Sequence, residues 1–358
     1  MSKLTRRGVM VLGGALSLAG TAKAQTSDIE RWGFYEITLD GPKAGNPFVD
    51  VTLAAEFRNG AQTVRVPGFY DGDGVYKIRF SPETEGAWQW RTTSNAKALA
   101  GRSGSFTARP ASGGNHGPVR VTADGYHFAY ADGTPFRQIG TTAYAWAQQS
   151  DAQCALTLQT LKAAPFNKIR MCVYANVKAL PIEPFAYTGT DPKDWDAARF
   201  NPAFFRRFED RVAKLQGLGI EADIILHHPY DKVHGYAEMV RADDERYLRY
   251  VIARLGAYRN VWWSMANEFD LVKAKTPADW DYIGRFVADT DPHQRLRSIH
   301  NCKAFFDNRK PWVTHSSIQN GMSVKDDTRA EIYRSVWEKP VVFDEICYEG
   351  KTDLRWGN

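Results

Sequence analysis

Apolar and polar residues alternate with a period of two through the first hundred residues. Residues 75–80 show this clearly, since Tyr76, Ile78 and Phe80 are separated by Lys77 and Arg79. Such alternation is typical of a strand with one buried face. Six such runs separated by turn signals predict an immunoglobulin-like β-sandwich over residues 25–110. The runs span residues 34–39, 50–57, 62–66, 75–80, 87–92 and 104–108.

Two tryptophans of this region, Trp88 and Trp90, share one strand face. They could form a platform on which sugars stack, or they could belong to the core of the sandwich. We favour the core, because aromatic residues at period two usually point inward.

Residues 111–134 connect this region to the rest of the chain. They begin with a Gly- and Pro-rich linker, and two short apolar runs at 119–121 and 127–130 follow. The runs predict a hairpin that closes the bottom of the next domain.

From residue 135 the pattern changes to strands that alternate with amphipathic helices. Alternation of this kind predicts a parallel sheet closed as a TIM-type (β/α) barrel over residues 135–358. We count seven strands, whereas a complete barrel has eight, so we expect the eighth strand and last helices to be missing. The expected strands are 136–142, 168–174, 220–226, 261–267, 296–300, 312–316 and 341–344, and the expected helices are 151–163, 202–218, 243–258, 277–289 and 328–337.

Carboxylates follow two of these strands, where the carboxyl ends of barrel strands form the active-site mouth. Asn267 and Glu268 follow the fourth strand, and Asp344 and Glu345 end the seventh. A pair of carboxylates suits glycosidic bond cleavage, since one donates a proton and the other attacks or activates water.

Each carboxylate also has a structural interpretation. Glu268 could be an acid at a helix start that Asn267 caps. Asp344 and Glu345 should point to opposite faces of a strand, so we expect only one in the barrel and the other paired outside it.

Further polar and aromatic residues accompany the expected strand ends. Arg170 lies within the second strand, where it forms a structural ion pair, holds the nucleophile ionised, or does both. Four histidines end strands and could bind sugar hydroxyls, although a single histidine there is usually a hydrogen-bonded core group: His227, His228, His300 and His315. Aromatic residues near the mouth could stack on sugars, although each is individually more typical of packing: Tyr144, Trp146, Tyr174, Tyr230, Trp263 and Tyr348.

This set of residues resembles clan A of the retaining glycoside hydrolases, which includes the cellulase and mannanase families. Residues 66–76 and 81–88 resemble the immunoglobulin-like module that precedes apiosidase-like members of the clan. The resemblance implies that Glu268 is the acid/base and Glu345 the nucleophile. It also implies that Asn267 bonds the sugar 2-hydroxyl. The remaining residues expected to bind substrate are Arg170, His227, His228, His315, Trp146, Tyr230 and Tyr348.

Residues 1–24 predict an export signal of the twin-arginine type. Arg6 and Arg7 precede a short apolar stretch, which ends in a small-x-small cleavage signal before Gln25. We therefore expect a periplasmic or secreted protein; the alternative is an N-terminal membrane anchor. The leader carries four of the net +5 charges, so the remainder is nearly neutral and gives no electrostatic reason to bind nucleic acid or membrane.

Metal or cofactor chemistry has little support in the sequence. The four cysteines fit no zinc spacing, and Thr141–Tyr144 replaces the His-x-His of metal-dependent barrel hydrolases. We therefore expect a glycosidase that acts on a carbohydrate without metal or cofactor. The alternative, suggested by the missing eighth strand, is an inactive carbohydrate-binding protein or a gene fragment. The sequence does not indicate which sugar is cleaved or an oligomeric state.

Overall fold

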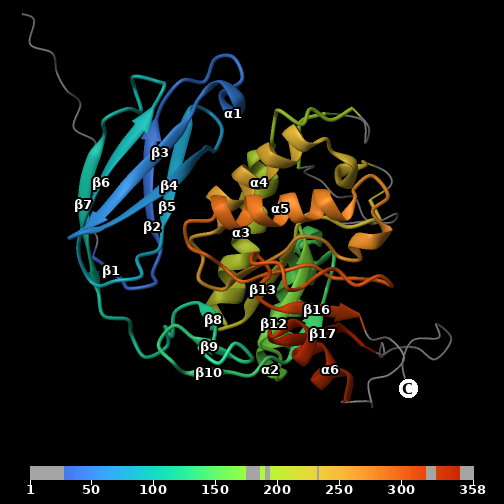
Figure 1. The fold of residues 1–358 in the computed structure, drawn as a ribbon. Helices are drawn as coiled ribbons and strands as arrows, with labels where there is room; N and C mark the ends of the chain where they lie inside the picture. The colour runs from blue at the N-terminus through green and yellow to red at the C-terminus, as the bar shows by residue number, and fades with distance from the viewer. Residues whose placement is uncertain (1–27, 175–185, 190–193, 232–233, 320–327, 347–358) are drawn as a thin grey trace, which may run out of the picture.

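The computed structural model describes residues 28–174, 186–189, 194–231, 234–319 and 328–346. An N-terminal β-unit packs beside an α/β barrel, and a small three-stranded sheet lies at the lower end of the barrel (Figure 1). The leader and Tyr348 lie outside the described residues. Within those ranges, no helix is both long and apolar enough to cross a membrane.

The N-terminal unit is a seven-stranded sheet in the order β1-β7-β6-β3-β4-β5-β2. Side chains from β2 through β7 enclose one core, in which Trp88 and Trp90 are 0% and 5% exposed, so their interpretation as core residues is confirmed. The elements are β1 (Ile29–Glu30), β2 (Tyr35–Asp40), α1 (Pro47–Asp50), β3 (Leu53–Asn59), β4 (Gln62–Tyr70), β5 (Val75–Phe80), β6 (Gly86–Ser94) and β7 (Ser103–Arg109).

The barrel has seven parallel strands among the described residues, as the sequence predicts. The first five form one sheet, the last two pair with each other, and a bridge between His300 and Ser317 joins the two groups. The strands are β11 (Gly140–Thr142), β12 (Lys168–Cys172), β13 (Glu221–Ile225), β14 (Val261–Ser264), β15 (Arg297–Ser298), β16 (Ser316–Gln319) and β17 (Val341–Glu345). The mixed α/β, barrel-like fold is confirmed, with fewer helices than a complete barrel has.

Two of the barrel helices begin at residues whose side chains cap them. The Asn201 side chain accepts a hydrogen bond from the Ala203 N–H at 3.1 Å, and Thr276 and Asp279 form a capping box. These caps fix where the chain leaves each loop. The helices are α2 (Asp151–Ala163), α3 (Pro202–Gly217), α4 (Arg241–Leu255), α5 (Pro277–Thr290) and α6 (Thr328–Trp337), and short 3₁₀ turns are η1 (Trp146–Gln148), η2 (Tyr236–Glu238) and η3 (Phe269–Leu271).

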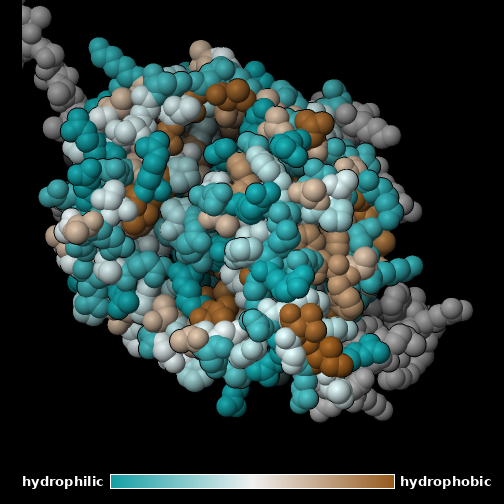
Figure 2. Space-filling view, in the orientation of Figure 1, coloured by the Kyte–Doolittle hydropathy of each residue, from teal (hydrophilic) through white to brown (hydrophobic). Residues whose placement is uncertain are grey.

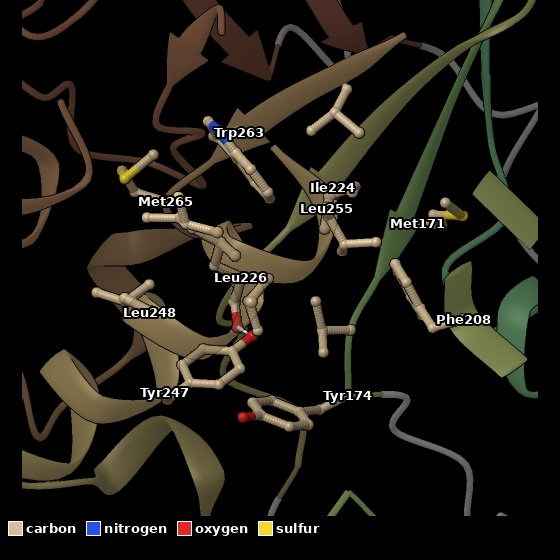
Figure 3. Close-up of a cluster of buried hydrophobic side chains, with 14 of the residues drawn as sticks. Met171, Tyr174, Phe208, Ile224, Leu226, Tyr247, Leu248, Leu255, Trp263 and Met265 are labelled. Carbon is tan, nitrogen blue, oxygen red and sulfur yellow. Dashed lines mark hydrogen bonds between the residues drawn. The ribbon is translucent and has the colours of Figure 1, made fainter. Parts of the chain in front are cut away.

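The outward faces of the central strands pack under these helices (Figure 3). Ile224 and Trp263 lie on neighbouring strands and are fully buried. Tyr247 of α4 donates its hydroxyl hydrogen to the Leu226 carbonyl at 3.0 Å, so the ring packs while its polar end is satisfied. Removing a buried ring such as that of Trp263 would cost about 3–5 kcal/mol.

A three-stranded sheet closes the amino end of the barrel. It consists of β8 (Val119–Val121), β9 (Phe128–Tyr130) and β10 (Pro135–Phe136). The Phe128 ring lies 5.3 Å from the ring of Trp262, which is near the start of β14. Chemistry at the carboxyl ends of the strands is therefore at the opposite, open end.

Buried ion pairs join the N-terminal unit to the barrel. Arg79, which strand alternation places opposite the apolar face of β5, is only 5% exposed because it contacts the barrel. Its Nη1 lies 2.7 Å from Glu209 of α3 and 2.7 Å from the Arg254 carbonyl. Arg254 in turn lies 2.8 Å from Asp71. Each buried charge has a partner of opposite sign, which such positions require.

The sixth barrel strand begins later than the sequence pattern suggests. The apolar Trp312 packs against α5, where Gly284 leaves room for its ring and Asp281 accepts its indole N–H at 2.9 Å. The strand β16 therefore starts at Ser316. The prediction of a strand over 312–316 is wrong, because its apolar residues serve helix packing.

Apolar side chains are exposed on one side of the barrel, around α6. Figure 2 shows brown surface at its lower right, where α6 lies in Figure 1. Ile332 and Val336 of α6 are 53% and 55% exposed. A groove of about 720 Å³ lies nearby between the small sheet and β17. Among the described strands, β11 and β17 do not pair with each other.

Candidate active site

The turn after β14 carries Glu268 in a left-handed backbone conformation, with φ 46° and ψ 57°. Hydrogen bonds on both sides hold it: the Asn267 N–H donates to the His227 carbonyl, and the Phe269 N–H donates to the His300 carbonyl, both at 2.9 Å. No side chain caps the following η3 turn. The interpretation of this pair as a helix cap therefore has no support, and strain of this kind concentrates at functional sites.

The seventh strand directs both of its carboxylates into the barrel. A register shift between β16 and β17 pairs Ile318 with Phe343 but Gln319 with Glu345. This bulge gives Asp344 and Glu345 the same side, so the expectation that one pairs outside is wrong.

Both carboxylates meet cations of β12. The Lys168 Nζ lies 2.7 Å from Asp344 Oδ1, and Arg170 Nη1 lies 3.4 Å from Glu345 Oε1. Both pairs are buried, with side chains at most 4% exposed. The bulge thus delivers one carboxylate to each of two neighbouring buried cations.

Side chains of different charge lie around the Glu345 carboxylate. Besides Arg170, the Tyr144 hydroxyl donates a hydrogen bond to Oε1, and His300 Nε2 lies 3.6 Å from the same oxygen. Burial, and then the charge of Arg170, lower the pKa of His300 well below its usual value, so this imidazole is neutral. Glu345 thus faces one cation, one hydroxyl donor and one neutral imidazole.

Asn267 and Arg170 belong to the same network. Asn267 Oδ1 accepts a hydrogen bond from Arg170 Nη2 at 3.0 Å and lies 3.4 Å from the Tyr144 hydroxyl oxygen. Arg170 Nε also lies 4.0 Å from Asp223. Arg170 therefore forms the structural ion pair and also contacts Glu345. That it holds the nucleophile ionised stays a prediction.

Glu268 has surroundings of a different kind. Burial, and then the charge of Glu345, raise its pKa above the ordinary 4.5. When the Gln319 amide is oriented so that its oxygen and nitrogen both find partners, the nitrogen donates to Glu268 Oε1 at 3.2 Å. A raised pKa suits an acid that must carry a proton near neutral pH.

The two histidines that follow the third barrel strand, His227 and His228, form hydrogen bonds within the protein. His227 bonds the Met265 carbonyl at 3.2 Å through Nδ1 and Asp244 of α4 at 3.0 Å through Nε2. His228 bonds the Tyr174 carbonyl through Nε2 and accepts from the Tyr230 N–H at 3.2 Å. In this arrangement neither ring contacts Glu268 or Glu345.

His315 lies at the other end of the barrel from Glu268 and Glu345. It precedes β16, and its ring lies 5.2 Å from Trp262 and 5.5 Å from Phe128, both at the closed amino end. Burial lowers the pKa of His315 to about 4. The late start of β16 explains this position, and it brings Gln319 rather than His315 to the mouth.

The predicted aromatic residues fall into two groups. Trp146 of η1 is 3% exposed in the barrel core, whereas Tyr230 is 40% exposed and stacks on His228 at 6.3 Å. Tyr144 contacts the carboxylate of Glu345 through its hydroxyl, a role that the prediction of a stacking ring does not include. Tyr230 is the most exposed of the three, and Tyr144 is half-buried.

The site residues that the sequence prediction misses include Gln319 and Cys302. A predicted sixth strand that ended at Gln319 would have indicated the first. Cys302 lies in the loop after β15, where its thiol interacts with Glu268, and no sequence motif marks it. Among the described residues, no group of three or more acidic, His or Cys side chains is arranged to hold a metal ion.

A parallel barrel with Glu268 and Glu345 at strand ends, and Arg170 and Asn267 between them, is the arrangement of a glycoside hydrolase. The chain belongs to the apiosidase-like family, since the model described as "Apiosidase-like, catalytic domain" matches residues 122–357. A second model, a domain of unknown function numbered 5060, matches residues 28–95. The prediction of a glycosidase of this family is confirmed.

Solved structures agree with this family. A proposed glycoside hydrolase from Bacteroides vulgatus ATCC 8482 is 43% identical, with a TM-score of 0.88 over 93% of this chain and 68% of its own. A family 5 glycoside hydrolase from the same organism is 17% identical, with a TM-score of 0.51 over 65% of this chain and 54% of its own. An endo-1,4-β-mannanase from Rhizomucor miehei is 14% identical, with a TM-score of 0.50 over 66% and 83%. The last two support the fold alone, and no curated protein matches the chain.

Proposed function

We propose that the protein hydrolyses O-glycosidic bonds of poly- or oligosaccharides by double displacement, with retention of configuration. The observation that supports it is that two buried carboxyls, Glu345 and Glu268, have different neighbouring groups. Glu345 meets the Arg170 cation and the Tyr144 hydroxyl, whereas burial and the charge of Glu345 raise the pKa of Glu268. One group is thus prepared to be a nucleophile and the other an acid.

In the first step Glu345 forms a bond to the anomeric carbon as the glycosidic C–O bond breaks. The leaving oxygen takes its proton from Glu268, which becomes a carboxylate. In the second step Glu268 takes a proton from water, whose oxygen attacks the anomeric carbon and releases Glu345. Asn267, fixed by Arg170, is the proposed partner of the sugar 2-hydroxyl.

The test compares the E268A and E345A variants on a panel of aryl glycosides, including an apioside because of the family's name. We expect each variant to lose about 10²- to 10⁴-fold in kcat/KM. Proton NMR of the first product should show a retained anomer, and azide should restore turnover to E268A with formation of a glycosyl azide. An inverted first product would refute double displacement, and full activity of either variant would refute the assigned roles.

We also propose that the protein is exported, on the basis of residues 1–24. Replacement of both Arg6 and Arg7 by Lys should retain the precursor in the cytoplasm if a twin-arginine pathway carries it. Fractionation of a bacterial host followed by immunoblotting measures this. Equal periplasmic yield from the variant would rule out that pathway.

A further inference from the structure

The loop that follows β15 is held by the residue two positions after Glu268. Asp270 Oδ1 accepts the N–H of Cys302 at 2.7 Å, and Oδ2 accepts those of Lys303 at 2.9 Å and Ala304 at 3.0 Å. Burial raises the pKa of Asp270, but these three donors outweigh it and keep the pKa below the usual 3.8. An ionised carboxylate therefore fixes three consecutive backbone groups beside the active-site turn.

Two neutral side chains lie against Glu268: Cys302 of this loop and Gln319 at the end of β16. The Cys302 thiol interacts with the Glu268 carboxyl and, as a weak donor, lowers its pKa. The Gln319 amide nitrogen, in its satisfied orientation, lies 3.2 Å from Glu268 Oε1 and 3.1 Å from the carbonyl of Asn301. The Gln319 backbone N–H also donates to Asn301 Oδ1 at 3.3 Å, which locks the end of β16 to the same loop.

The two carboxyls of the site are thus held by different chemistry. Glu345 contacts a cation, Arg170, at 3.4 Å. A cation beside Glu268 would favour the carboxylate form of Glu268 and oppose its donation of a proton. A thiol and an amide orient a carboxyl without adding charge, so Glu268 can alternate between its two protonation states.

We propose that Cys302 and Gln319 are positioning residues for the acid/base carboxyl of Glu268, and that Asp270 positions Cys302. This inference rests on the proposed function, because it assumes that Glu268 transfers the proton. It names three residues that the sequence pattern does not indicate.

The test measures the pH dependence of kcat/KM for C302A, Q319A and C302S in the full chain. Both donors lower the pKa of Glu268. Their removal should therefore move the alkaline limb of the profile to higher pH, and C302S, whose hydroxyl also donates, should restore it. C154A is the matched control, since it removes a buried thiol from the barrel core, and its profile should overlay the wild type.

A leaving-group series provides a second readout. Loss of orientation at the acid should reduce kcat/KM about tenfold for aryl glycosides with poor leaving groups and little for those that depart without a proton. If the residue had a purely structural role, its removal would lower kcat/KM equally for both kinds of substrate. The charge of Asp270 also raises the pKa of Glu268 directly, so the pH profile of D270A is not diagnostic. The leaving-group series is used instead: D270A should show the dependence of C302A and add little to that variant.

The inference is refuted if C302A and Q319A keep the wild-type alkaline limb and show no dependence on the leaving group while E268A is inactive. If E268A is itself fully active, the proposed function fails instead. Thermal unfolding of each variant shows whether it is folded. If C302A does not fold, the pH profiles of C302S and Q319A still test the proposal. Q319A keeps the Cys302 thiol, and C302S keeps the Gln319 amide.

Discussion

The buried Lys168 offers a quantitative test of the ion network beneath the nucleophile. Its Nζ lies 2.6 Å from Asp223 and 2.7 Å from Asp344, and its side chain is 1% exposed. Replacing it with Met leaves two buried carboxylates without their shared cation. Breaking a buried pair in this way costs about 3–5 kcal/mol. At roughly 2 °C per kcal/mol for a chain of this size, the unfolding temperature should fall by about 6–10 °C.

A matched control lies on the surface. Lys214 and Asp210 are also 2.7 Å apart, but their side chains are 48% and 47% exposed. The K214M variant makes the same chemical change, yet an exposed i,i+4 pair contributes only about 0.3–0.5 kcal/mol. Differential scanning fluorimetry of both variants separates burial from charge loss. Equal shifts for K168M and K214M would refute the reasoning.

The destabilisation of K168M should also depend on pH, in a direction that follows from the pKa of Asp344. Burial raises the pKa of Asp344, but Lys168, and then Arg170, outweigh it and hold the pKa below its usual value. Without Lys168 the effect of burial is less opposed, so the pKa of Asp344 rises. A carboxyl whose folded-state pKa is lowered stabilises the fold above its unfolded pKa, and this contribution is lost as pH falls through the folded pKa. K168M has less of this contribution to lose, so its destabilisation should be smaller at about pH 3 than at about pH 7, and a pH-independent shift would contradict this account.

Two further predictions concern individual site residues. The Y144F variant loses the hydrogen bond to Glu345, so kcat/KM on an aryl glycoside should fall about 10- to 100-fold, as expected for a bond to a charged group; unchanged kinetics would mean that the hydroxyl is dispensable. The H315F variant should retain kcat/KM within about twofold because His315 packs at the closed amino end, and a larger loss of activity in folded protein would support its predicted place in the sugar subsite.

The overall architecture follows from sequence periodicity. The alternation in β5 and the apolar outward faces of β12 through β14 each have a single arrangement that buries them, so the strand-rich unit and the barrel are both predictable. Glu268 and Glu345 are predictable for the same reason, since each directly ends an apolar run. The ends of the strands, where the chemistry lies, are fixed by weaker local signals.

The errors share one physical cause, which is competition for apolar and polar side chains between neighbouring elements. Trp312 could have belonged to a strand, but its ring packs against Gly284 of α5. The strand β16 therefore starts after it. The later start exchanges His315 for Gln319 at the mouth. Local periodicity does not contain this information, because the competing helix lies about 30 residues earlier in the sequence.

The bulge in β17 has a similar origin. In a regular strand Asp344 would face the helices, where its charge would need a partner; the interior of the barrel already offers Lys168 and Ser317. One extra residue in the strand satisfies both acids at once, so burial of charge decides the register. Since Lys168 also comes from the strand that carries Arg170, the two cations of β12 specify a place for two consecutive carboxylates. This pairing explains why the sequence Asp344-Glu345 ends the seventh strand although simple alternation has room inside for only one of them.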